Sequence, residues 1–84
     1  MTEEQSRTIL FENMKLFEEF LESPQYQDFL RLRKDDKQIH NLLNEMAMRW
    51  ETVKFFMKIK HTHPRAIHES HLLADLVVRV MDYE

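Results

Sequence analysis

The sequence of 84 residues contains no cysteine and no glycine. Without cysteine there are no disulfides, no thiol chemistry and no cysteine-based zinc sites. Without glycine the chain lacks the residue that most easily adopts a left-handed backbone, which argues against β-hairpins and phosphate-cradling loops. No apolar run approaches the roughly 18 to 20 residues of a membrane span or of a signal segment with its flanks. We therefore expect a cytoplasmic protein that does not associate with membranes.

The residues that are present follow a helical pattern. One apolar row runs through the middle of the chain in steps of four, three, four, three and four, as on one face of a long helix: Ile39, Leu43, Met46, Trp50, Val53 and Met57. A second row lies about half a turn away, at about 100° per residue, and comprises Met48, Thr52, Phe55 and Ile59. A helix that is apolar on two opposite faces needs two partners. The rest of the chain supplies one, and a second copy or a different protein supplies the other.

Capping residues and the two prolines set the helix boundaries. Thr2 with Gln5 three residues later is typical of a capping box at a helix start. Ser23 is expected to cap a helix that begins at Pro24, and Pro64 begins the last helix. The predicted helices cover residues 3–22, 24–34, 36–61 and 64–82.

The connection between the second and third of these helices is the least defined. Six of the seven residues from 31 to 37 are charged, and none of them is a strict helix breaker. We expect a break near residues 34 to 36 with Asp35 or Asp36 as the cap, and a helix that continues unbroken to His61 is the alternative. The sequence predicts a single all-α domain over residues 1–84, a small bundle of three to four helices around one long central helix, forming a dimer.

Charge is distributed unevenly along the chain. Residues 1–30 carry two basic and seven acidic groups, residues 31–65 carry nine basic and four acidic groups, and residues 66–84 carry one basic and four acidic groups. The simplest interpretation is that the acidic outer helices pack beside the basic middle one. The other interpretation is a basic surface open to nucleic acid or to an acidic partner.

The second apolar row indicates the candidate partner-binding surface. We expect Met48, Phe55, Phe56 and Ile59 to contact a partner, with Arg49, Lys58 and Lys60 around them for orientation. Phe11 and Leu16, at opposite margins of the first helix, are second choices. The function predicted is that of a small non-catalytic protein-interaction module, regulatory, adaptor or structural, acting as a homodimer or by binding another protein.

Two alternatives come from the segment 49–65 and the residues that follow it. This segment is basic and contains Trp50, Phe55 and Phe56, a mixture that is able to bind phosphates and stack bases, so a nucleic-acid-binding regulator is the first alternative. A weaker one is metal binding by four clustered histidines, His61, His63, His68 and His71. No phosphate-binding loop or nucleophile motif is present, so we expect no enzyme activity, no cofactor and no small-molecule substrate.

Overall fold

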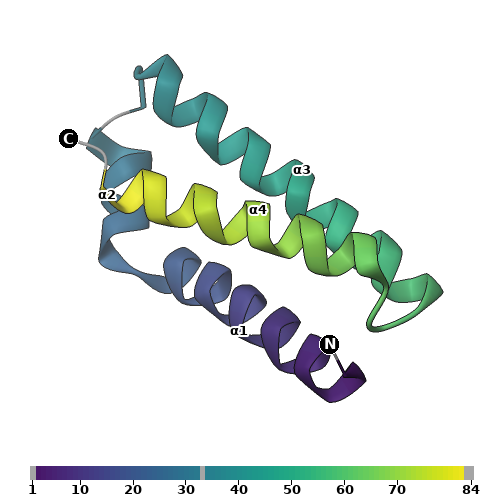
Figure 1. The fold of residues 1–84 in the computed structure, drawn as a ribbon. Helices are drawn as coiled ribbons and strands as arrows, with labels where there is room; N and C mark the ends of the chain where they lie inside the picture. Colours follow the sequence, from purple (N-terminus) through teal and green to yellow (C-terminus); the bar gives the residue numbers. More distant parts are fainter. Residues whose placement is uncertain (1, 33, 83–84) are drawn as a thin grey trace.

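The computed structural model describes residues 2–32 and 34–82, and these residues form an elongated bundle of four helices that measures 42 × 18 × 17 Å. The helices are α1 (Glu3–Glu22), α2 (Pro24–Leu32), α3 (Lys37–Ile59) and α4 (Pro64–Met81), and Figure 1 shows their arrangement. The described residues contain no strand. The all-helical fold predicted from the sequence is therefore confirmed.

Each helix begins at a residue that satisfies free backbone donors. Thr2 Oγ1 accepts from the Gln5 amide at 3.1 Å, and Gln5 Oε1 accepts from the Thr2 amide at 2.9 Å, which completes a capping box. Ser23 Oγ accepts from the Tyr26 amide at 3.2 Å at the start of α2. These short polar side chains fix the beginnings of helices where the sequence places them.

The break between α2 and α3 has a similar cause. The Asp36 carboxylate accepts hydrogen bonds from the amides of Gln38 and Ile39, at 3.0 and 3.3 Å, so Asp36 caps α3. Residues 34 and 35 form a turn before it, and residue 33, in the predicted second helix, lies outside the described residues. At its other end α3 stops at Ile59, two residues earlier than expected, because Lys60 is extended and its carbonyl accepts from the His63 amide.

The helix with the most extensive packing is α4. It lies between α1 and α3 and contacts both along its length, as Figure 1 shows. Its buried positions recur every three or four residues: Ala66, Glu69, Ser70, Leu73, Leu76, Val77 and Val80. Such a wide stripe packs against two helices at once. The prediction that the longest helix occupies the centre is not confirmed, since α3 has only three buried residues, Ile39, Met46 and Val53.

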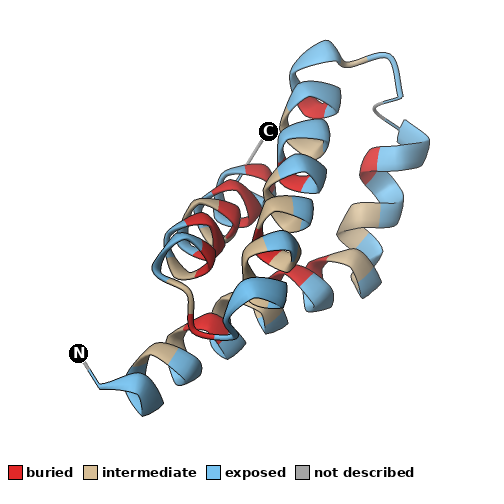
Figure 2. Ribbon diagram, turned by 90° about the vertical axis from the view of Figure 1, so that its right-hand side faces the viewer, coloured by how far each residue is buried: buried red, intermediate tan, exposed pale blue. Residues whose placement is uncertain are grey.

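The core has two parts. The larger part joins all four helices through Phe17, Phe20, Phe29, Ile39, Met46, Leu73, Leu76, Val77 and Val80. The smaller part, Leu10, Val53 and Ala66, lies towards the α3–α4 turn. Figure 2 shows the buried residues on the facing sides of the helices and the exposed residues on their outer sides. The first apolar row of α3 faces this core, which leaves the second row on the opposite side.

Candidate interaction surface on helix α3

The second apolar row of α3 is exposed on the outside of the bundle. Met48 is 70% exposed, Phe55 60% and Ile59 62%. Thr52 is half-buried between them, and its hydroxyl donates to the Met48 carbonyl at 2.9 Å, so the hydroxyl is satisfied within the helix. We call these four residues, Met48, Thr52, Phe55 and Ile59, the outer stripe. Three large, exposed apolar side chains therefore lie in line on one helix face, which makes this face the candidate interaction surface.

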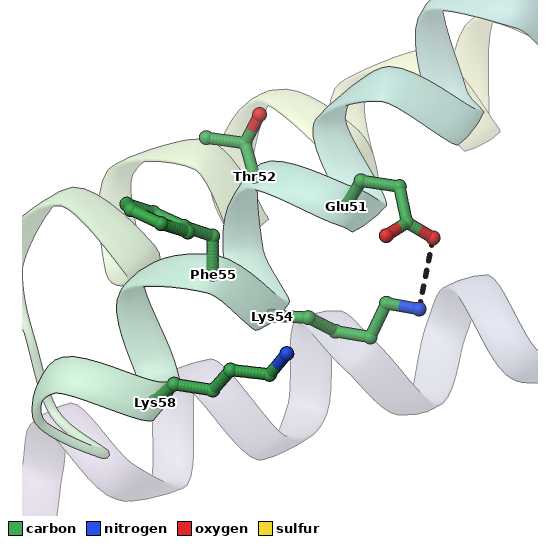
Figure 3. Close-up of a pocket in the computed structure, with 5 residues that line it drawn as sticks. All are labelled: Glu51, Thr52, Lys54, Phe55 and Lys58. Carbon is green, nitrogen blue, oxygen red and sulfur yellow. Dashed lines mark ion pairs between the residues drawn. The ribbon is translucent and has the colours of Figure 1, made fainter.

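Charged side chains border the outer stripe on one side. Figure 3 shows Thr52 and Phe55 projecting from one side of α3, with Glu51, Lys54 and Lys58 along the other, and together these five residues line a shallow depression. Lys54 Nζ lies 2.9 Å from Glu51 Oε1. The border therefore carries both signs of charge, which suits recognition of a surface with its own pattern of charges.

Phe56 connects the outer stripe to the core. It is half-buried and packs against the smaller core cluster, and its ring centroid lies 5.2 Å from that of Phe55 in an edge-to-face arrangement. The centroid of the His63 ring lies 4.8 Å from that of Phe56, and the Arg65 guanidinium lies 5.5 Å from the Phe56 centroid. The Phe55 ring, although exposed, therefore rests against a neighbour that is itself held by the core.

Arg49 has a structural contact that was not predicted from the sequence. Its Nη1 donates to Glu69 Oε2 of α4 at 2.7 Å, and its Nη2 lies 3.5 Å from Glu45 Oε1. The hydrogen bond with the Glu69 carboxylate is the main cause that raises the pKa of Arg49, and the attraction of both carboxylates adds to it. Arg49 therefore joins α3 to α4. The acidic and basic blocks of the sequence are the signal that points to this pair.

The other predicted contact residues differ in accessibility. Lys58 and Lys60 are exposed, and neither forms an ion pair with another residue in the part of the chain that the structure describes. On α1, Phe11 is 67% exposed. Leu16 is half-buried and packs against the larger core, so much of its surface is already covered. The structure thus gathers the exposed candidates on α3, with Phe11 apart from them on α1.

Other exposed apolar residues lie towards the C-terminal ends of α2 and α4. Leu32 of α2 is 71% exposed, and Val78 and Met81 of α4 are 51% and 45% exposed. None of them is among the contact residues predicted from the sequence. They belong to two helices, whereas the outer stripe continues along one helix face for three turns.

The four clustered histidines differ in their contacts. His63 caps α4, since its Nδ1 accepts from the Arg65 amide at 3.0 Å, and His71 Nδ1 lies 3.3 Å from Asn13 Nδ2. His61 and His68 are exposed. Over residues 2–32 and 34–82, no three histidine, aspartate or glutamate side chains come together in a way that would hold a metal ion.

The basic segment 49–65 is partly engaged in packing. The Trp50 ring lies 5.2 Å from the Phe17 ring of α1, and Lys54 Nζ lies 5.6 Å from the Trp50 ring centroid. Arg49 is paired with Glu69, and Arg65 lies over Phe56. Several of the aromatic and basic groups proposed for nucleic-acid binding are thus engaged within the bundle, while Phe55, Lys58 and Lys60 are exposed.

Comparison with models of known protein families gives no match, and neither the curated proteins nor the solved structures yield a similar one. No helix among the described residues has the length and apolar character required to cross a bilayer.

Proposed function

We propose that this chain is a small non-catalytic protein-interaction module that binds through the outer stripe of α3, either to a second copy of itself or to a different protein. The observation that supports this proposal most strongly is the exposure of Met48, Phe55 and Ile59 on the face of α3 opposite the core. The expected role is regulatory, adaptor or structural, in the cytoplasm.

The exposed apolar surface of the outer stripe limits the free energy that this chain contributes to association. Full burial of a methionine, phenylalanine or isoleucine side chain contributes about 1.5–3 kcal/mol. With 60–70% of each of the three side chains still exposed, a partner that covers them gains about 3–6 kcal/mol from this chain's side alone. Association costs at least about 4 kcal/mol in lost freedom of motion, so the partner must contribute apolar surface of its own. A complementary apolar helix face meets that requirement.

Nucleic-acid binding through segment 49–65 is the alternative, and it has less support. Base stacking requires accessible aromatic rings, and of the three in this segment only Phe55 is exposed, since Phe56 is half-buried and Trp50 packs against Phe17. Phosphate contacts require available cations, and Arg49 is paired with two carboxylates. Lys58, Lys60 and His61 remain as an exposed basic group at one end of α3.

The replacement Phe55→Asp tests the proposed function. Phe55 is 60% exposed, so a carboxylate there is tolerated by the folded chain but disfavoured in an apolar contact. We expect it to weaken association at least tenfold, measured by sedimentation of the purified chain over a range of concentrations and by retention of proteins from the native host's lysate. Leu32→Asp, at a site 71% exposed on α2, is the matched control and leaves association unchanged.

Circular dichroism and thermal unfolding establish that both variants remain folded. The proposal is wrong if the unmodified chain neither self-associates nor retains a protein that the Phe55→Asp variant loses. It is also wrong if Leu32→Asp weakens association as much as Phe55→Asp does.

A further inference from the structure

The spacing of the residues in the outer stripe is the same in both directions along the helix. Met48 and Ile59 are its two ends, and Thr52 and Phe55 lie equally far inside them. If two copies of α3 lie antiparallel with a two-fold axis midway between residues 53 and 54, each Met48 meets the partner's Ile59, and each Thr52 meets the partner's Phe55. The four, three, four spacing of the stripe matches the knobs-into-holes packing of paired helices.

The side-chain sizes favour this antiparallel pairing over a parallel one. In the antiparallel register a large phenyl ring packs against a small threonine in both central layers. In a parallel register Phe55 meets Phe55 and Thr52 meets Thr52, which places two bulky groups in one layer and two small ones in the next. Alternating large and small side chains across an interface fills space better.

The charged border of the stripe favours the same pairing. Glu51 lies between the levels of Met48 and Thr52, and Lys58 lies between the levels of Phe55 and Ile59. Glu51 and Lys58 lie on the same side of α3 in Figure 3. In the antiparallel register the two intervals coincide, so each Glu51 faces the partner's Lys58 on that side. Lys58 has no ion-pair partner among the described residues of its own chain. Glu51 is exposed and has a second carboxylate oxygen besides the one near Lys54.

We propose that the occupant of the outer stripe is the outer stripe of a second copy, antiparallel and related by a two-fold axis, with Glu51 and Lys58 forming two reciprocal ion pairs. This inference rests on the proposed function and specifies its partner. The contact is isologous, so it closes at two copies and leaves no stripe open for further addition.

Cysteine cross-linking tests the register. Because the chain has no native cysteine, any disulfide that forms must join the introduced residues. In the antiparallel dimer two copies of residue 48 lie about 16.5 Å apart along the helix, since eleven residues separate the levels of 48 and 59. That distance exceeds the reach of a disulfide, for which Cα atoms lie within about 7 Å. We therefore expect no covalent dimer from Met48→Cys alone or Ile59→Cys alone under oxidising conditions, and a covalent dimer from their mixture. Asp75→Cys, at an exposed site on α4, gives the background of random collisions.

Charge reversal tests the occupant independently of the cysteines. Glu51→Lys places two lysines opposite each other across both ion pairs, and Lys58→Glu places two glutamates opposite each other. Because two pairs change from attraction to repulsion, we expect each variant to self-associate about tenfold more weakly. Mixing the two variants puts opposite charges together again at both places, so the mixture associates within about threefold of the unmodified chain.

Each outcome has one meaning. Cross-linking of Met48→Cys with itself shows a parallel dimer and overturns the antiparallel register. Cross-linking no greater than that of Asp75→Cys, together with no recovery on mixing the charge variants, overturns self-association through the stripe. If the chain is then monomeric but retains a different protein in a manner that Phe55→Asp abolishes, the proposed function stands and only this inference fails. If Phe55→Asp changes no binding at all, both fail.

Discussion

The replacement Arg49→Met removes the charged group that links α3 to α4 while keeping a long side chain in its place. Glu69 is only 6% exposed, so without Arg49 its carboxylate remains buried beside α3 without the guanidinium that accompanies it. A hydrogen bond to a charged group contributes about 1.5–3 kcal/mol, and an isolated buried charge costs more. Because one third of the Arg49 side chain is exposed and water enters the site, we take the lower part of that range. The expected loss in the free energy of unfolding is about 2 kcal/mol.

Urea unfolding measures this loss, with Trp50 fluorescence and circular dichroism as two probes of the same transition. Lys15→Met is the matched control, since Lys15 and Glu19 lie 4.0 Å apart with both side chains more than 60% exposed. That control is expected to change the free energy of unfolding by less than about 0.5 kcal/mol. In a chain of this size, 2 kcal/mol corresponds to a fall of roughly 8–16 °C in the thermal midpoint.

The dependence of this effect on pH follows from the sign of the pKa shift. The pKa of Arg49 is raised above its ordinary value, chiefly by the hydrogen bond with Glu69. A group whose pKa is raised on folding contributes stability that is fully present below its unfolded pKa and is lost only as pH rises through the folded one. The contribution of Arg49 is therefore constant through the neutral range and decreases only in strong alkali. If Arg49→Met costs no more than Lys15→Met in neutral buffer, the structural role assigned to Arg49 is refuted.

Two further replacements test the packing and the helix boundary. Leu73→Ala, at a residue with no exposed surface in the centre of α4, is expected to cost about 2–5 kcal/mol and to leave little folded protein in mild urea. A cost below about 1 kcal/mol contradicts the central position of α4. Asp36→Ala removes the cap of α3 and is expected to cost about 1 kcal/mol in thermal or urea unfolding, whereas Asp36→Asn keeps an acceptor and costs less. Equal losses in the alanine and asparagine variants argue against the cap.

The helix boundaries were predictable because they depend on neighbouring residues. Thr2, Ser23 and Asp36 each bond to backbone groups two or three residues away, so the local sequence contains the whole interaction. The end of α3 was less predictable, because nothing in the side chains of Lys60 and His61 forbids a helix. The turn that ends α3 depends on a backbone bond from His63 to the Lys60 carbonyl, which forms where the chain reverses into α4.

The arrangement of the helices was not predictable in the same way. The apolar rows of α3 indicated two packing faces, and the longest helix was a reasonable centre. In the structure the wide buried face of α4 lies between α1 and α3 instead. That result depends on which faces fit together between distant parts of the sequence, which are 57 residues apart in the bond from Asn13 to Ser70 and 20 apart in the pair of Arg49 and Glu69. The pairing of Arg49 with Glu69 depends on the same arrangement, so it too was missed.

The exposure of the outer stripe has a geometric explanation within the chain itself. The wide face of α4 already packs against the opposite side of α3, and the Phe17 ring of α1 contacts Trp50 on that inner side as well. The remaining helix, α2, has only nine residues, and it packs chiefly beside α1 at the far end of the bundle, as Figure 1 shows. No described helix is therefore left to cover Met48, Phe55 and Ile59. An apolar row that the fold leaves uncovered costs solubility unless another molecule covers it, and this cost is the physical argument for the proposed partner of α3.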